Sequence, residues 1–368
     1  MPTKMADAGD DRDVAPPAPR RNPELIGHER AEATLLDDYR SGRLAHAWLI
    51  TGPPGIGKAT FAFRFARFLL AGGGGEDLFG DAPAGLAVDP ADLVFRRVAA
   101  GSHGDLLTLE PGYDDRRKVM REKIVVDEVR TVGPFLRMTP AEGGWRVVVV
   151  DSADALNTNA ANALLKAIEE PPDHTVVLLV SHAPGRLLAT IRSRCARLAL
   201  RPLDDDTVET FLRDHRPEID AEEAAAIARL AAGSPGRALG LADIGGLALY
   251  REMVDLVGQA PSLDPDALHD FADRVARGDG GAYHTVMELL GQWLVELVRT
   301  GASASAARPV VAGEDAVRER LLAARGLEEW TEVWEKVTGL VASAERLTLD
   351  RKQVVLAAFA AFEAAPRA

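Results

Sequence analysis

The residues most able to do chemistry form a glycine-rich loop, GPPGIGK, that runs from Gly52 to Lys58 and is followed by Ala59. In a phosphate-binding loop of this kind, backbone N–H groups and the lysine hold the phosphates of a nucleotide, and a Ser or Thr hydroxyl after the lysine binds Mg²⁺. Ala59 has no oxygen to offer, and the next side chain, Thr60, points about 100° away around the helix. The loop therefore predicts a nucleotide site without its magnesium ligand. Its candidate residues are Gly52, Gly55, Gly57, Lys58, Ala59 and Thr60.

A second motif lacks its catalytic residue in a matching way. The run Val147–Val150 is typical of a buried strand, and it ends in Asp151, where nucleotide-hydrolysing enzymes place an acid that supports Mg²⁺. In ATPases with an Asp-Glu pair, the next residue activates the attacking water, a general-base contribution of about 10²–10⁴-fold. Here the next residue is Ser152. Asp154 could replace the glutamate, although its position favours a cap on the following helix. We therefore interpret the site as one that does not hydrolyse ATP.

The sequence around these motifs predicts an α/β region with a parallel sheet. Short apolar runs alternate with helical or loop segments up to about Pro202. The predicted strands are 47–51, 105–109, 123–126, 146–150 and 175–180. A helix is predicted over Lys58–Leu70, directly after the loop, which gives the order of strand, loop and helix that a phosphate-binding loop needs. The Gly-rich segment 71–90 is predicted to be a surface loop.

From Leu203 onward the sequence predicts only helices. One helix carries apolar residues at spacings of four and three, which places them in a single stripe. The stripe consists of Trp330, Trp334, Val337, Val341 and Ala344. Such a stripe is more often part of a core than of an interface, but packing against a helix of another chain would have the same pattern.

The composition is that of a soluble globular chain, with 368 residues, 47% of them hydrophobic and 27% charged. No apolar run is long enough to cross a membrane and the first residues lack a signal-peptide core, which predicts a cytoplasmic protein. A net charge of −13 makes the isolated chain a poor nucleic-acid binder. Cys195 is the lone cysteine, so no internal disulfide, no multi-cysteine zinc site and no other metal site is expected. We interpret His46 and His182 as structural histidines, because they have no metal-ligand companions in the sequence.

Two further runs carry a family resemblance. Asn162–Pro172, NALLKAIEEPP, and Ile191–Cys195, IRSRC, are similar to the clamp-loader branch of the AAA+ superfamily. The resemblance implies an α/β fold: an AAA+ P-loop core with a parallel sheet, a small helical lid and an all-helical C-terminal collar. Many relatives carry a four-cysteine zinc module in the core, which this chain cannot build. The implied divisions are a disordered tail at 1–21, the core at 22–202, the lid at 203–245 and the collar at 246–368.

The resemblance also implies roles for single residues. The arginine of the Ser-Arg-Cys element acts on the ATP of a neighbouring subunit in this family, and it corresponds to Arg194. An arginine supplied in trans can accelerate phosphoryl transfer by roughly 10³–10⁵. Ser181 matches the first sensor of the γ-phosphate, and Arg237 matches the second sensor, on the lid. The chain's own site would then hold ATP or ADP without turnover, or no nucleotide.

The implied function is that of a largely non-catalytic subunit. It would complete a five-subunit ring with other clamp-loader subunits and help to load the sliding clamp onto primer-template DNA. Two alternatives remain open. An active ATPase of the same branch, of the gamma/tau type, predicts Ser or Thr at position 59 and Glu at position 152, and both are absent. A nucleotide-sensing scaffold without a trans-acting arginine is distinguished only by the chemistry of Arg194 in an assembly.

Overall fold

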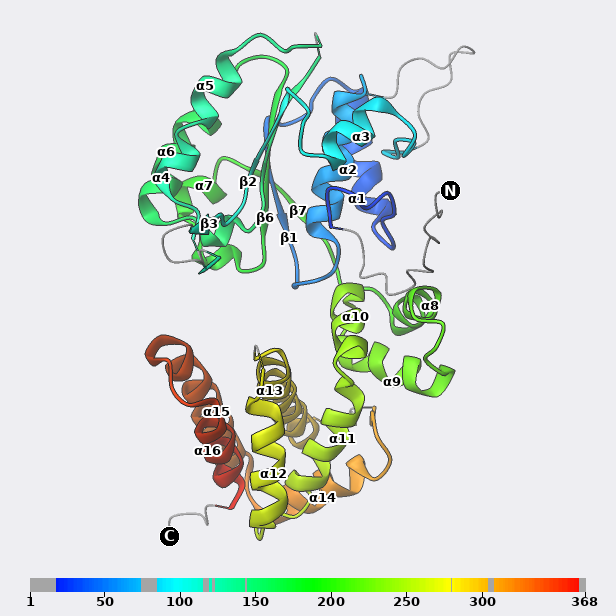
Figure 1. Cartoon of the computed structure of the whole chain (residues 1–368), viewed down its shortest axis with the longest axis vertical. Coiled ribbons are helices and arrows are strands. Elements are labelled where there is room, and N and C mark those ends of the chain that lie inside the picture. Colours follow the sequence, from blue (N-terminus) through cyan, green and yellow to red (C-terminus); the bar gives the residue numbers. More distant parts are fainter. Residues whose placement is uncertain are drawn as a thin grey trace, which may run out of the picture. The chain divides into compact units, whose positions relative to one another are not determined.

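The chain divides into two compact units, one up to Asp204 and one from Asp205 onward. Figure 1 shows the computed structural model, which describes residues 18–73, 85–114, 119–120, 123–142, 144–278, 280–303 and 308–363. Most of the predicted tail at 1–21 and the middle of the predicted loop at 71–90 lie outside these residues. Among the helices that are described, none is long and apolar enough to cross a membrane.

The first unit is built on a five-stranded sheet in which all neighbouring strands are parallel. Its spatial order is β2-β5-β6-β1-β7, so the strand before the glycine-rich loop lies inside the sheet and not at its edge. The strands are β1 (Ala47–Thr51), β2 (Leu106–Leu109), β5 (Arg146–Val150), β6 (Thr175–Ser181) and β7 (Ala196–Ala199). Every residue of β5 and β6 is buried, which explains the continuous apolar runs 147–150 and 176–180 within them. A separate antiparallel pair consists of β3 (Tyr113–Asp114) and β4 (Val119–Met120).

Helices cover both faces of this sheet, as Figure 1 shows. Because side chains alternate along a strand, Trp48 and Ile50 of β1 pack into one core, and Ala47 and Leu49 pack into the other. The first core includes α1 (Glu29–Arg40), α2 (Lys58–Leu70) and α3 (Leu93–Ala99). The second includes α4 (Val126–Val129), α5 (Val132–Arg137), α6 (Thr158–Glu169) and α7 (Ala189–Arg192). Short 3₁₀ turns at Ala153–Ala155 and Pro184–Arg186 complete the connections.

The predicted fold class, a P-loop core with a parallel sheet followed by helices, is confirmed, and helix α2 has the predicted bounds. The predicted strand at 123–126 is wrong. Ile124 makes only an isolated bridge to Leu156, and helix α4 begins at Val126. The helix forms because the Glu128 carboxylate accepts a hydrogen bond from the Val125 N–H at 3.1 Å and Val129 is buried beside α6.

Strand β7 was not predicted. It is short and lies at the edge of the sheet, and only Leu198 of its four residues is buried. A strand with so little buried apolar surface has no clear period in its sequence. Its pairing with β1, from Trp48 opposite Ala196 to Thr51 opposite Ala199, nevertheless fixes the position of the Ser-Arg-Cys element that precedes it.

The second unit is entirely helical in its described residues. Asp220, Ser234 and Asp264 cap the helices that follow them, each through its side-chain oxygen. The helices are α8 (Asp205–His215), α9 (Ala221–Ala231), α10 (Pro235–Asp243), α11 (Gly246–Val257), α12 (Pro265–Ala276), α13 (Gly281–Ala302), α14 (Glu314–Ala324), α15 (Leu327–Leu347) and α16 (Arg351–Glu363). The predicted division between a lid at 203–245 and a collar at 246–368 falls within this unit and stays a prediction.

The predicted stripe on α15 is mostly core. Trp330, Val337 and Ala344 are buried, whereas Trp334 and Val341 are half-buried. Trp330 packs beside Phe362 of α16, with ring centroids 5.8 Å apart. The half-buried Trp334 and Val341 line a groove in the second unit.

Candidate nucleotide site and exposed arginine

The glycine-rich loop joins β1 to α2 and depends on three glycines with positive φ, Gly52, Gly55 and Gly57. A Cβ atom at Gly52 would lie 2.6 Å from the Leu200 carbonyl oxygen, so this glycine allows the loop to pass close to the end of β7. The loop is held from the N-terminal side by His28, whose Nε2 lies 2.6 Å from the Ile56 carbonyl oxygen. The backbone thus has the cradle shape that the sequence predicts.

Lys58 begins α2 and is buried at 3% exposure. Its ammonium donates a hydrogen bond across the loop to the Pro53 carbonyl oxygen. Burial lowers the pKa of Lys58 to about 8, against the opposing effect of the negative charges of Asp154 and Asp151. The lysine therefore lies beside two carboxylates that reach the site from the end of β5.

Asp151 and Ser152 follow β5 directly, as predicted. The Asp151 N–H donates to the Leu109 carbonyl oxygen at 2.8 Å. Burial raises the pKa of Asp151, and the nearby Glu110 carboxylate adds to this effect. Ser152 has φ 63°, which is uncommon for a residue other than glycine, and this left-handed residue turns the chain into the short 3₁₀ turn that contains Asp154.

The prediction that Asp154 caps the next helix is wrong. Asn157 caps α6, because its side chain accepts a hydrogen bond from the Ala160 N–H at 2.8 Å. The Asp154 carboxylate instead accepts hydrogen bonds from the Ser181 hydroxyl and from the His182 N–H, the latter at 2.8 Å. The turn set by Ser152 thus brings Asp154 into the nucleotide site.

Ser181, the predicted first sensor, is fully buried at the end of β6. It lies opposite Thr51, the last residue of β1 before the loop, so the predicted sensor and the loop are neighbours. His182 belongs to the same site, because burial lowers its pKa and the Lys58 ammonium lowers it further. The interpretation of His182 as a structural histidine stays a prediction.

These residues fit a phosphate group but not a magnesium-bound triphosphate. The loop amides and Lys58 form the cradle, whereas Ala59 has no hydroxyl and Thr60 is buried on α2. Among the described residues, no group of three His, Cys, Asp or Glu side chains could hold a metal ion. The hydroxyl of Ser181 is already hydrogen-bonded to a carboxylate. We therefore derive no hydrolytic step at this site.

Arg194 lies in the connection between α7 and β7, and its side chain is 41% exposed. Its Nε lies 2.8 Å from a carboxylate oxygen of Glu169, and its Nη1 donates to the Thr190 carbonyl oxygen at 3.1 Å. The adjacent Cys195 is buried, and burial raises the pKa of its thiol to about 11. Arg194 is thus fixed in position by Glu169 at the end of helix α6 and by the buried Cys195 that follows it in the chain.

Arg194 and Lys58 lie at opposite ends of two neighbouring parallel strands. The two strands β1 and β7 are parallel, Arg194 comes before the first residue of β7, and the glycine-rich loop comes after the last residue of β1. The paired segment from Ala196 to Ala199 spans about 10 Å at roughly 3.3 Å per residue. The guanidinium therefore does not reach the phosphate cradle of its own chain.

Arg237, the predicted second sensor, is on α10 in the second unit. Its guanidinium donates to the Gln292 side-chain oxygen at 2.8 Å and lies 3.3 Å from a Glu288 carboxylate oxygen. Burial lowers the pKa of Arg237, and Glu288 opposes that shift. In this unit the arginine binds helix α13.

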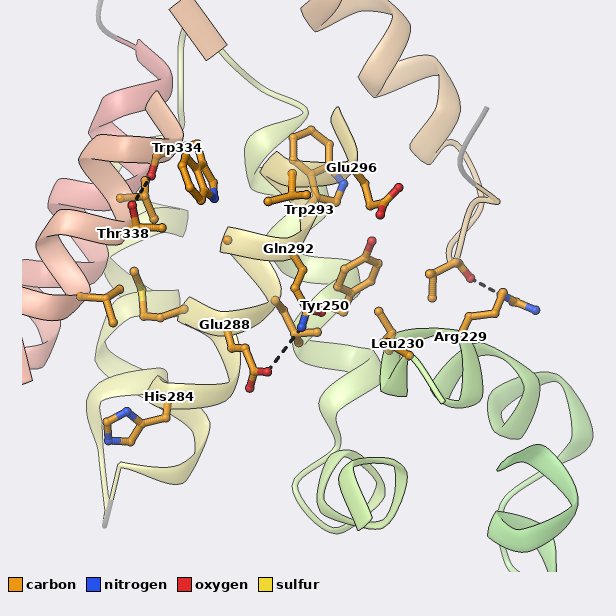
Figure 2. Close-up of a pocket in the computed structure, with 18 of the residues that line it drawn as sticks. Arg229, Leu230, Tyr250, His284, Glu288, Gln292, Trp293, Glu296, Trp334 and Thr338 are labelled. Atoms are coloured by element: carbon orange, nitrogen blue, oxygen red, sulfur yellow. Dashed lines mark hydrogen bonds between the residues drawn. The ribbon is translucent and has the colours of Figure 1, made fainter. Parts of the chain in front are cut away.

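A groove of about 920 Å³ in the second unit was not predicted from the sequence. Figure 2 shows Glu288 and Gln292 of α13 on one side and Trp334 and Thr338 of α15 on another. Gly291 also lines the groove and leaves free space there, because a Cβ atom added to it would meet no atom within 4 Å. Val295, which is 38% exposed, also lines the groove.

The chain is similar to several subunits of DNA polymerase III. Residues 27–204 match the family described as "DNA polymerase III, delta subunit". DNA polymerase III subunit delta' of Pseudomonas aeruginosa is 40% identical over 192 residues, 52% of this chain and 54% of that protein. The Escherichia coli subunit delta' is 36% identical over 207 residues, 56% of this chain and 57% of that protein. This chain thus spans about half the length of the two delta' relatives.

A further relative covers more of the chain. DNA polymerase III subunit gamma/tau of Mycobacterium tuberculosis is 29% identical over 364 residues, 89% of this chain and 59% of that protein.

Proposed function

We propose that this chain, whose residues 27–204 match the family described as "DNA polymerase III, delta subunit", is a delta' subunit of a bacterial clamp loader. Its role in that assembly is to place Arg194 on the ATP of a neighbouring subunit. The observation that carries this proposal is the position of Arg194, which is exposed and lies at the opposite end of the strands from its own phosphate cradle. An arginine so placed can act only on a nucleotide that another chain holds.

The chemistry of a guanidinium supports this role. Phosphoryl transfer places charge on the γ-phosphate oxygens, and a planar, permanently charged arginine fork stabilises that charge. In the isolated chain, the carboxylate of Glu169 holds the fork near the protein surface. An exposed ion pair of this kind is worth about 0–1 kcal/mol, so a phosphate can displace the carboxylate.

The chain's own site supports a subunit that does not hydrolyse ATP by itself. Ala59 provides no magnesium ligand, and Ser152 replaces the general base. The purified chain should therefore show no ATP hydrolysis above background in a steady-state phosphate-release assay. A rate like that of an ordinary ATPase of this branch would favour the gamma/tau-type alternative and contradict the proposal.

The proposed partners are the other clamp-loader subunits in a five-subunit ring, and through them the sliding clamp and primer-template DNA. The groove on the second unit supports a subunit contact, because Val295 and Trp334 leave apolar surface beside the free space at Gly291. A groove lined by a glycine lets a helix backbone approach closely. Because a net charge of −13 disfavours DNA binding by the isolated chain, contacts with DNA would be local or shared with the partner subunits.

One observation favours a second candidate, a scaffold without a trans-acting arginine. Arg194 already has two partners in its own chain, Glu169 and the Thr190 carbonyl oxygen. If these contacts are its whole role, the arginine stabilises the turn before β7 and does nothing to a neighbour. The two candidates make opposite predictions for an assembled complex.

The test is a reconstituted clamp loader that contains Arg194→Ala. We expect normal assembly but slower DNA- and clamp-stimulated hydrolysis and slower clamp loading. The loss at the adjacent site alone should approach roughly 10³-fold, the lower end for a trans arginine. Because the other subunits' sites stay intact, total hydrolysis falls only in part, and clamp loading is the more sensitive measurement.

Two further variants sharpen this test. Arg194→Lys should restore little activity, because an ammonium cannot reproduce the planar fork. Arg197→Ala is the matched control, an exposed arginine three residues further along on β7, and it should load clamps at the normal rate. Unchanged loading and hydrolysis by an assembled Arg194→Ala complex would refute the trans role and favour the scaffold.

A further inference from the structure

Asp154 was expected to cap a helix, yet its carboxylate contacts Ser181 and His182 in the candidate nucleotide site. Its carboxylate accepts the hydroxyl proton of Ser181, which is fully buried, and the His182 N–H at 2.8 Å. Ser181 lies opposite Thr51, next to the start of the glycine-rich loop. The negative charge of Asp154 also acts on the Lys58 ammonium. Asp154 therefore lies where the outer phosphates of a nucleotide would approach the lysine.

This arrangement has two consequences for a bound nucleotide. A serine hydroxyl has one proton to donate, and that of Ser181 is committed to Asp154, so it is not free for a γ-phosphate oxygen. The carboxylate also adds a second negative charge beside Lys58, next to that of Asp151. A third phosphate group would bring further negative charge to a place with two carboxylates and one ammonium.

We propose that Asp154 is a specificity-determining residue that makes the phosphate cradle discriminate against nucleoside triphosphates and favour diphosphates. The inference deepens the proposed function, since it concerns the degenerate site of the same subunit. It does not require that Arg194 act in trans. The loop amides and Lys58 still bind the inner phosphates, while Asp154 excludes the outermost one by charge and by holding the Ser181 hydroxyl.

The test measures nucleotide binding by the full-length chain, with ADP and the slowly hydrolysed analogue ATPγS as probes in isothermal titration calorimetry. The wild-type chain should bind ADP more tightly than ATPγS. Asp154→Ala should increase the affinity for ATPγS by about tenfold, the effect of about 1.4 kcal/mol of charge interaction. The affinity for ADP should change by less than about threefold, because its phosphates lie further from Asp154.

Asp154→Asn protects the test against a folding defect, because it keeps the shape of the side chain and removes only the charge. It should also raise the ratio of ATPγS to ADP affinity. Circular dichroism and thermal melting establish whether each variant is folded. Ser181→Ala is the matched control, since it removes the hydroxyl but leaves the carboxylate in place, and it should not increase ATPγS affinity.

The double variant Asp154→Ala with Ser181→Ala separates the two effects. It should retain the part of the gain that comes from charge and lose the part that comes from the freed hydroxyl. Three results would overturn the proposal: an unchanged affinity ratio in folded Asp154 variants, an equal gain for ADP and ATPγS, or no nucleotide binding by any variant. Each leaves the Arg194 experiment unaffected, because that experiment measures hydrolysis at another subunit's site.

Discussion

The loss of one buried carboxylate, that of Glu314, should destabilise the helical unit strongly. Glu314 is fully buried at the start of α14. Its carboxylate accepts hydrogen bonds from the Tyr250 hydroxyl, from the Arg318 guanidinium and from two backbone N–H groups, that of Val310 at 2.7 Å and that of Val311 at 3.3 Å. Burial raises the pKa of Tyr250, and the Glu314 charge raises it further, so the phenol stays a proton donor. One side chain thus joins α11, α14 and the segment before α14.

The expected loss in the free energy of unfolding of Glu314→Ala follows from the buried groups that would lose their partner. Arg318 is only 3% exposed, so its positive charge would stay buried with weaker compensation. Removal of one partner of a buried ion pair typically costs about 3–5 kcal/mol. Asp315, 3.6 Å from Arg318 Nη1, retains part of the interaction, which places the expected loss near the lower end, about 3 kcal/mol. Glu314→Gln keeps the size and one oxygen acceptor, so its cost should be intermediate.

Urea unfolding followed by circular dichroism measures this loss as a change in the free energy of unfolding of the helical unit. The matched control is Glu296→Ala, which removes an exposed helical pair with Arg299, 2.7 Å apart. That control should cost less than about 0.5 kcal/mol. The reasoning is refuted if Glu314→Ala destabilises the unit by no more than the control does.

Three other variants or treatments test separate features. Asn157→Ala removes the cap of α6 and should cost about 1 kcal/mol in the α/β unit, measured by urea unfolding; a loss below about 0.3 kcal/mol would show that the cap is not used. The Cys195 thiol, buried and with its pKa raised to about 11, should not react with a thiol reagent at pH 8 in the native protein but should react fully in urea; rapid native labelling would contradict this burial. Val295→Glu should leave the helical circular dichroism unchanged but prevent co-elution with the partner subunits in gel filtration, because it replaces an exposed apolar side chain of the groove by a charge; normal co-elution would exclude that groove as the subunit contact.

Much of the α/β unit could be predicted from the sequence because its central strands are buried on both faces. Strands β5 and β6 have no exposed residue, so each contains an unbroken apolar run, 147–150 in β5 and 176–180 in β6. Strand β7 carries no such signal, since it is an edge strand in which only Leu198 is buried. The segment at 123–126 is apolar for a different reason: it leads into the short helix α4 and contributes Ile124 to the core.

The residues of the candidate site could likewise be predicted only in part from the sequence. Lys58 and Asp151 were predicted from the motifs that contain them, and Ser181 from the family resemblance. In the fold they lie close together because the carboxyl ends of parallel strands meet on one side of a sheet. The bond from Ser181 to Asp154 depends on the left-handed turn at Ser152, and serine is not a residue that predicts such a turn. The pair of Arg194 with Glu169 joins two elements whose proximity no local pattern records.

Gly52 lies close to Leu200, which gives this glycine a structural role that does not depend on a bound nucleotide. A Cβ atom at Gly52 would come within 2.6 Å of the Leu200 carbonyl oxygen, closer than these atoms can approach, so any side chain at this position should push the end of the edge strand outward. Arg194 stands at the other end of that same strand. A larger side chain at Gly52 should therefore displace the edge strand and, with it, Arg194 at the far end of that strand, even when no phosphate is bound.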